Sequence, residues 1–525
     1  MLTIAFRVDA SSTIGNGHLM RCLTLAHQLS NPTNKIYFIC RAFSEEMLTH
    51  ITFFGYSVLI LPIGSVSVVK EKTATWLSDS QENDASKTIE VIKKLAFIDL
   101  MIVDSYAIDF TWHNLVQPYY NSLMVIDDLA NRQHLCNILL DQTYHCEQVS
   151  YLPLVPKKCK FLLGEEFILL RGEFRKLRLE TIKKRKSPPP SSIKLLITMG
   201  GTDPDNLNGI ALNAVHKLKI KYPKLSVIIV LSANAPHLLT IQKLIASFSW
   251  ISLKIDVNNI AELMKDAHLA IGESGSTSWE RCCLGLPTLT IISADNQKKM
   301  DTVLACLGAT KSLGLHTTLT DNDIVLAADS ILSTPKIYNN MVKKSLLVCD
   351  GKGAIRASKR LDSIVPQIEY RIAKMEDCEL TYRWQSNAQL RRYFIQPKTP
   401  SWQEHVQWYN ACLLDPNRIL YLLHDNQKNS VGLLRLDQLT ENGHVTDEYE
   451  ISIIISPEHQ GKGIASRALK KLRLLRRNAC YIATINNKNT HSINAFLKAG
   501  FQKSIQPALY SLNVIDFEIK NTNKT

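Results

Sequence analysis

The sequence predicts an α/β protein made of two facing Rossmann-like units followed by a smaller α+β unit. Apolar, strand-length segments alternate with amphipathic, helix-length segments over residues 1–182 and again over residues 193–365. A charged, proline-rich segment separates these regions at residues 183–192, and the alternation changes over residues 366–525. A chain of 525 residues is long enough for several cores. We therefore expect two halves of one α/β module and a separate C-terminal domain.

The expected strands of the first region are short and almost wholly apolar, as is typical of parallel strands covered by helices. They are TIAFRV, KIYFIC, SVLILP, LMIVD, SLMVID and NILLD. The expected helices are HLMRCLTLAHQLS, which follows the first strand, and residues 87–95. The segment KKRKSPPPSS then predicts a stiff, solvated linker, because three prolines stand among charges and serines.

The second region repeats this alternation, and its expected strands are KLLITMG, LSVIIVLS, ISLKID, LAIG and TLTII. Ligands of open parallel sheets bind beyond the carboxyl ends of the strands, so two such sheets predict a cleft between the halves. The third region contains IEYRIAKMEDCELTYRWQSN, RILYLLHD, NSVGLLRLD and EYEISIII. A strand, a polar helix and apolar runs typical of antiparallel strands together predict an α+β unit with the size of one domain.

The composition, 45% apolar and 21% charged, is that of a soluble globular protein. The longest apolar runs have strand length, and the N-terminus lacks the basic start and cleavage site of a signal peptide. The twelve cysteines are scattered without a CxxC pair. We therefore expect a cytoplasmic protein with reduced thiols, no metal and no membrane partner.

The net charge of +13 suits anionic partners, whether nucleotides, coenzyme A or nucleic acid. Part of the excess lies in runs such as residues 183–186 and RLLRR at residues 473–477. Such runs are more often solvated faces or linkers than binding patches. We expect no nucleic-acid partner, and a tRNA acetyltransferase is the weakest hypothesis that we retain.

The turn after the first strand contains IGNGH, in which Gly15 and Gly17 allow positive φ and close approach to a ligand. The helix that begins near His18 aims its N-terminal amides at the same point, and an imidazole there can move a proton near neutral pH. The alternative is a tight strand-to-helix turn with a capping histidine. The motif alone favours neither hypothesis.

The second region has two similar turns after strands. MGGTDPDN contains Gly200 and Gly201, and IGESGSTSWE contains three small residues followed by a helical glutamate: Ser274, Gly275, Ser276 and Glu280. Small residues with free amides suit a diphosphate, and a carboxylate one turn deeper suits ribose hydroxyls. Taken alone, the second turn is better explained as a serine-rich helix N-cap. Three glycine turns that face one cleft favour nucleotide binding instead.

Several motifs resemble those of the UDP-sugar hydrolases of pseudaminic acid biosynthesis, which are related to the GT-B glycosyltransferases. They are RVDASSTIGNGHLMRCLTLA, IVDSY, VIDDLANR, LRGEFR, MGGTDPDN and GESGSTSWERCCLGLPTL, and they span nearly all of residues 1–365. The resemblance implies a GT-B-like fold with UDP against the second half and a 2,4-diacetamido-trideoxyhexose reaching toward the first. It implies inverting hydrolysis of the bond between the sugar and UDP.

His18 matches the catalytic histidine of these hydrolases, so the resemblance implies that it deprotonates the attacking water. Amides at Gly201 and around Ser274 to Ser276 are expected to stabilise the negative charge on UDP. Four strand-end aspartates are candidates to orient the sugar or the imidazole, although such residues often only cap turns. They are Asp9, as a catalytic candidate, and Asp104, Asp127 and Asp128; Arg21 of the MR pair is a further substrate-binding candidate.

A glycosyltransferase of the same fold, in which a sugar hydroxyl replaces water, is the alternative to a hydrolase, because fold alone does not decide the acceptor. The pairing of DASS, GxGH and MR with VIDD belongs to the hydrolase resemblance. We therefore favour hydrolysis.

In the third region, HQGKGIASRAL follows a strand and opens a helix, with Gln460, Gly463 and Ala465 in the pattern Q-x-x-G-x-A. This pattern resembles the acetyl-CoA pyrophosphate loop of the GNAT N-acetyltransferases, in which amides at a helix N-terminus meet a diphosphate. NTHSINAFLKAGF also resembles that family, as do WQSN and WQEHVQWY. The resemblance implies acetyl-CoA as a cosubstrate, with Gly461 and Asn489 as further binding residues.

Many members of that family carry a tyrosine that protonates the departing thiolate, and Phe496 stands at the matching position. Glu448 and Glu450, on the strand beside the cofactor, are candidates to accept the proton of the amine. They are equally compatible with the solvent face of an amphipathic strand. A domain that only binds acyl-CoA and regulates the first module is therefore an alternative.

In the pathway that the resemblance implies, acetylation of a 4-amino group immediately precedes removal of UDP. A fused acetyltransferase would then carry out two successive steps on one chain. The sequence thus predicts a bifunctional enzyme whose partners are a UDP-sugar and acetyl-CoA.

Overall fold

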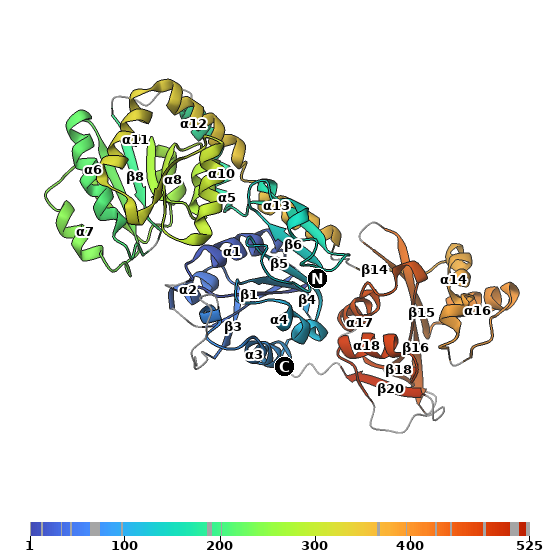
Figure 1. Ribbon diagram of the computed structural model, residues 1–525. Coiled ribbons are helices and arrows are strands. Elements are labelled where there is room, and N and C mark those ends of the chain that lie inside the picture. Colours follow the sequence, from blue (N-terminus) through green and yellow to red (C-terminus); the bar gives the residue numbers. More distant parts are fainter. Residues whose placement is uncertain are drawn as a thin grey trace.

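Three units follow one another along the chain in the computed structural model, around sheets A, B and C (Figure 1). The expected fold class, two Rossmann-like units and an α+β domain, is confirmed. The structure describes residues 2–11, 14–32, 34–41, 45–62, 74–95, 98–185, 192–200, 202–364, 368–394, 396–425, 428–441, 444–475, 479–503 and 514–520.

The first unit is built on a parallel sheet with the strand order β3-β2-β1-β4-β5-β6-β7. Its strands are β1 (Thr3–Val8), β2 (Lys35–Arg41), β3 (Ser57–Leu61), β4 (Ile98–Asp104), β5 (Tyr120–Ile126), β6 (Ile138–Asp141) and β7 (Lys160–Leu163). Helices α1 (Gly17–Leu29), α2 (Glu45–Phe53), α3 (Gln81–Ile92) and α4 (Phe110–Val116) connect them. Because the strands are parallel, the carboxyl ends of β1, β4 and β5 meet at one edge of the sheet.

The second unit is also parallel, with the strand order β10-β9-β8-β11-β12-β13. Its strands are β8 (Lys194–Thr198), β9 (Ser226–Leu231), β10 (Ile251–Ile255), β11 (Leu269–Glu273), β12 (Thr288–Ile292) and β13 (Lys311–Leu315). Its helices are α6 (Leu207–Lys221), α7 (Leu238–Ile245), α8 (Ile260–Asp266), α9 (Thr277–Cys283), α10 (Lys298–Cys306), α11 (Asp321–Ser333) and α12 (Pro335–Val348).

Two helices cross between the units, so the expected domain boundaries were wrong by one helix at each end. Helix α5 (Gly172–Lys184) packs its buried Phe174 into the core of the second unit, and the Arg185 guanidinium bonds three carbonyls of that unit at 2.7–2.9 Å. The expected linker therefore does not begin at residue 183, and residues 186–191 lie outside the described residues. Helix α13 (Gly353–Ile364) returns to the first unit, where Ala357 and Leu361 join its core.

The third unit is a mixed sheet with the order β14-β15-β16-β17-β18-β20-β19. Its strands are β14 (Glu369–Ile372), β15 (Arg418–His424), β16 (Ser430–Glu441), β17 (His444–Ile455), β18 (Cys480–Asn486), β19 (Gln502–Lys503) and β20 (Val514–Lys520). Helices α17 (Ile464–Leu475) and α18 (Thr490–Lys498) lie on the side of the first unit, and α14 (Cys378–Gln385) and α16 (Trp402–Leu414) lie on the far side (Figure 1). The short α15 (Ala388–Arg391) follows α14.

No helix within the described ranges has the length and apolar character needed to cross a membrane. In the same part of the chain, no three His, Cys, Asp or Glu side chains are grouped in a way that could hold a metal ion.

The core of the first unit contains His134, which is only 2% exposed and whose Nε2 lies 4.0 Å from an Asp127 carboxylate oxygen. Burial lowers the pKa of His134 to about 4, and Asp127 opposes this only in part. A histidine in an unfolded chain has a pKa of about 6.5. As the pH falls between these values, the unfolded state is protonated first, so stability is lost in that window.

Lowering the pH from 7 to 5 is therefore expected to cost the folded state about 2 kcal/mol through His134. In His134→Gln this share of the loss should be absent, as measured by urea denaturation at the two pH values. His27→Gln is the matched control, since His27 is exposed on the surface of α1. An unchanged loss in His134→Gln would show that another group carries the pH dependence.

Candidate functional sites

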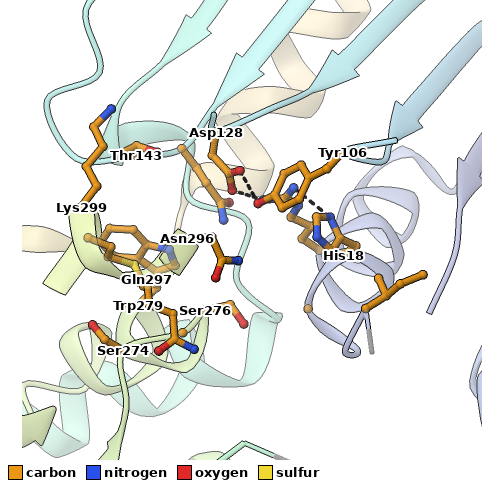
Figure 2. Close-up of a pocket in the computed structure, with 16 residues that line it drawn as sticks. His18, Tyr106, Asp128, Thr143, Ser274, Ser276, Trp279, Asn296, Gln297 and Lys299 are labelled. Carbon is orange, nitrogen blue, oxygen red and sulfur yellow. Dashed lines mark hydrogen bonds and ion pairs between the residues drawn. The ribbon is translucent and has the colours of Figure 1, made fainter. Parts of the chain in front are cut away.

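A cleft of about 230 Å³ lies between the first two units, at the carboxyl ends of their strands (Figure 2). The first unit lines it with Ile14, Gly17, His18, Arg21, Tyr106, Asp128, Gln142 and Thr143. The second lines it with Ser274, Gly275, Ser276, Trp279, Asn296, Gln297, Lys299 and Met300. The structure thus brings together the two glycine turns that the sequence placed in different halves.

His18 lies in the first turn of α1 and is held from behind by a buried carboxylate. Its Nδ1 is 2.6 Å from Asp104 Oδ1 at the end of β4, and Arg21 binds both oxygens of the same carboxylate at 2.6 Å. Burial raises the pKa of Asp104, but Arg21 and His18 together outweigh burial and lower it. An ionised Asp104 accepts the Nδ1 proton, so the neutral imidazole keeps Nε2 as its basic nitrogen.

Three of the four expected aspartates have structural partners instead of a place in the cleft. Asp9 is 4% exposed, its Oδ2 receives an Arg7 hydrogen bond at 2.7 Å, and its Oδ1 receives one from the Arg41 amide at 2.8 Å. Its expected catalytic role is therefore not retained. Asp104 is 1% exposed and does not line the cleft, and its contact with His18 favours the second of its two expected roles, to orient the imidazole and not the sugar. Asp127 is fully buried and paired with Arg132 at 2.7 Å.

Asp128 does line the cleft, and it is held by two neighbours (Figure 2). Arg21 Nη1 lies 3.0 Å from Asp128 Oδ2, and the Tyr106 hydroxyl donates a hydrogen bond to Asp128 Oδ1. The Tyr106 ring meets the edge of His18 at a centroid distance of 4.7 Å and stacks on Trp76 at 5.2 Å. Sequence reasoning missed Tyr106, although it follows the strand-end Asp104 by two residues.

Gly17 of the first unit faces Ser276 of the second so closely that a β-carbon on Gly17 would lie 3.3 Å from the serine hydroxyl. A side chain at Gly17 would therefore push the Ser276 hydroxyl by a few tenths of an ångström, whereas Gly15 has a positive φ of 78° that favours glycine. Ser274 is buried, and Gly275 and Ser276 complete the turn before α9.

The remaining expected contacts of the second unit are less direct. Gly200 does not line the cleft and faces the Glu273 carboxylate, and Gly201 lies outside the described residues. The Glu280 carboxylate is bound by Arg171 at 3.3 Å, and Glu280 does not line the cleft either. Burial raises the pKa of Glu280, and Arg171 opposes this shift. The cleft residues Asn296, Gln297 and Lys299 follow β12 without a motif that marks them in the sequence.

A second cavity, of about 480 Å³, lies in the third unit, where β17 and β18 separate. The two strands pair in parallel only from Glu448 with Cys480 to Glu450 with Ile482. Beyond that point, residues 451–454 and 483–486 line the cavity on its two sides. Glu450 lines this cavity, whereas the half-buried Glu448 does not.

The expected cofactor loop has a backbone that suits phosphate binding. Gly461 and Gly463 have φ values of 73° and 70°, and α17 begins at the next residue, Ile464. Gln460, Gly461 and Ala465 are accessible to solvent. The separated strands and exposed turn fit an acyl-CoA, whose pantetheine arm would lie between strands and whose diphosphate would meet the turn.

Asn489 and Phe496 both line the cavity from α18 and its N-cap. The Asn489 carboxamide accepts a hydrogen bond from the Ser492 amide at 3.1 Å, so it also caps this helix. The cavity is also lined by basic and aromatic side chains that sequence reasoning did not assign: Arg391, Tyr393, His405, Trp408 and Arg435.

The fold and the two sites define a module of two facing Rossmann-like units joined to an α+β domain with its own cavity. Residues 368–502 match the family described as acetyltransferase (GNAT) domain. The C-terminal unit is therefore a GNAT domain, and the predicted resemblance is confirmed for this unit.

The N-terminal region is homologous to the UDP-2,4-diacetamido-2,4,6-trideoxy-beta-L-altropyranose hydrolase of Campylobacter jejuni. The two are 28% identical over 307 residues, which cover 58% of this chain and 97% of that protein. An uncharacterized protein of Methanocaldococcus jannaschii is 25% identical over 524 residues, 96% of this chain and 97% of its own length. The spermidine N(1)-acetyltransferase of Escherichia coli is 29% identical over 140 residues, 26% of this chain and 72% of its own.

Proposed function

We propose that this chain catalyses two successive reactions on a UDP-linked amino sugar of pseudaminic acid biosynthesis. The GNAT domain acetylates the 4-amino group, and the N-terminal module then hydrolyses the UDP-2,4-diacetamido-2,4,6-trideoxyhexose to free sugar and UDP. One observation carries the proposal: His18, oriented by Asp104, faces the turn of Ser274 to Ser276 across a single cleft.

In the hydrolysis, His18 Nε2 accepts a proton from a water while the water oxygen attacks the anomeric carbon. The bond from that carbon to the UDP oxygen breaks, its electron pair leaves with UDP, and the configuration inverts. Asp104 stabilises the imidazolium that forms. The turn at Ser274 to Ser276 and the cationic Lys299 are placed to stabilise the charge on the departing diphosphate.

In the acetylation, the amine nitrogen attacks the carbonyl carbon of the acetyl-CoA thioester. A C–N bond forms, the C–S bond breaks, and coenzyme A leaves as a thiolate that takes a proton from water. Glu450, at the point where β17 and β18 separate, accepts the proton that the attacking amine loses. Phe496 carries no proton to donate, so the chain contributes no tyrosine acid at that position. The turn at Gln460, Gly461, Gly463 and Ala465 holds the diphosphate.

The charged side chains that line the GNAT cavity favour a nucleotide-linked amine over spermidine, the polyamine in the name of the Escherichia coli relative. Arg391 and Arg435 line the cavity together with Glu404 and Glu450, and the Arg435 guanidinium lies 5.8 Å from the centre of the Trp408 ring and is paired with Asp437 at 2.8 Å. Guanidinium groups attract a sugar diphosphate and repel a polycation.

A mass-spectrometric time course tests the proposal with the UDP-linked 4-amino precursor, with and without acetyl-CoA. We expect the acetylated UDP-sugar to form first and then free sugar and UDP, and we expect no acetylation of spermidine. Glu450→Gln should slow acetyl transfer ten- to a hundredfold, since a positioned base contributes about that much or more. Glu448→Gln is the matched control, two residues away on the same face but outside the cavity.

Acetylation of spermidine in preference to the UDP-sugar would contradict the assigned acceptor. Equal losses of acetyl-transfer rate in Glu450→Gln and Glu448→Gln would show that Glu450 is not the general base. Hydrolysis is assayed separately with the acetylated UDP-sugar, so a failure of either half is recognised on its own.

A further inference from the structure

The first turn of α17 touches the first unit as well as the expected phosphate loop. A β-carbon on Gly463 would lie 3.3 Å from Asn121 Oδ1, and the Ser466 hydroxyl lies 3.5 Å from the same oxygen. Ser466 is 2% exposed. Asn121 is the second residue of β5, so this contact lies at the amino ends of the strands, opposite the hydrolase cleft.

A carboxylate of the same edge completes the contact. Asp99, the second residue of β4, has its Oδ2 3.8 Å from Lys470 Nζ, and it acts electrostatically on Arg467, which is 7% exposed. Asp99 also accepts hydrogen bonds from Asn121 Nδ2 at 3.3 Å and from the Thr3 amide at 2.8 Å. The pair is therefore anchored in sheet A and presents an oxygen and a negative charge to α17.

We propose that the first unit and the phosphates of acyl-CoA compete for the N-terminal turn of α17. The inference rests on the proposed binding of acyl-CoA at residues 460–465. A diphosphate at that turn needs hydrogen-bond donors and cations. Asn121 presents an acceptor to the same donors, and Asp99 draws on the same cations, Arg467 and Lys470.

Asp99 also repels any phosphate brought to this turn, because both are anionic. Binding of acyl-CoA therefore weakens the contact between the GNAT domain and the first unit, and the contact weakens acyl-CoA binding by the same factor. The surface formed by Gly463, Ser466, Arg467 and Lys470 thus has two partners of like chemistry: the Asn121–Asp99 pair and a nucleotide diphosphate.

Isothermal titration of the full chain with coenzyme A tests this competition. We expect Asn121→Ala and Asp99→Asn each to bind coenzyme A three- to tenfold more tightly than the wild type, about the effect of one polar contact. Asp99→Asn is the conservative variant of the two, because its side-chain oxygen can still accept the hydrogen bond from the Thr3 amide. Gln117→Ala is the matched control, because this exposed amide precedes β5 at the same edge. Thermal melts check that each variant is folded.

Affinity that is unchanged or weaker in both variants would overturn the inference, since Asn121 and Asp99 would then be neutral or would help to bind the ligand. The wild-type titration separates this from the proposed function. If the wild type binds coenzyme A and the variants bind it with the same affinity, only the competition is wrong. If neither the wild type nor any variant binds coenzyme A, the acetyltransferase assignment and the competition are both wrong.

Discussion

Replacement of His18 by alanine is expected to lower the rate of UDP-sugar hydrolysis by about 10³-fold, because a positioned general base contributes about 10²–10⁴. Its neighbours in the cleft bind substrate without it, so kcat should fall with little change in KM. The assay follows release of UDP from the acetylated UDP-sugar. In the same experiment acetyl transfer by the GNAT domain should be unchanged, since that domain has its own cavity.

His27→Ala is the matched control, because His27 lies in the last turn of the same helix and is exposed. Added imidazole should restore part of the lost rate if the missing group is a base. Asp104→Asn should lower kcat as well, because a neutral amide no longer holds the Nδ1 proton. A His18→Ala variant within threefold of the wild-type rate would remove His18 from the reaction.

Replacement of Asp84 by alanine is expected to cost the first unit about 3–5 kcal/mol of folding free energy, the range for breaking a buried ion pair. Its Oδ2 lies 2.7 Å from both Arg7 Nη2 and Arg41 Nη2, and Trp112 Nε1 donates to its Oδ1 at 2.9 Å. Burial raises the pKa of Asp84, but the two arginines outweigh it and lower the pKa. Without Asp84, two guanidinium groups stay buried with too little negative charge nearby.

Urea denaturation at pH 7 measures this loss, with Glu82→Ala as the control on the exposed face of the same helix. Asp84→Asn keeps the volume and should lie between the wild type and Asp84→Ala. A loss below 1 kcal/mol in Asp84→Ala would show that the arginines find other partners. Because Arg7 of this cluster lies in β1, the first turn of α1, which follows β1 and carries His18, should lose order first.

The expected strands of the two Rossmann-like regions correspond to β1–β6 and β8–β12, because continuous apolar runs are a strong local signal. Strands β7 and β13 were not anticipated, since KFLL and KSLGL are short and partly exposed. The boundaries at residues 183 and 365 failed for a different reason. Helices α5 and α13 have ordinary amphipathic sequences, and no local signal says which of two units a helix packs against.

Local pattern determined the elements and the glycine turns, among them the turn before His18 and the turn at residues 460–465, because each depends on residues close in the chain. Tertiary structure decided which carboxylate serves the imidazole. Asp9, Asp104, Asp127 and Asp128 all stand at strand ends. Distant partners separate their roles: the Arg41 amide binds Asp9, His18 binds Asp104, and Arg21 binds Asp128 at the cleft. Parallel strands place many such ends at one edge of the sheet. The sequence of a single strand does not specify which side chains from neighbouring strands it will contact there.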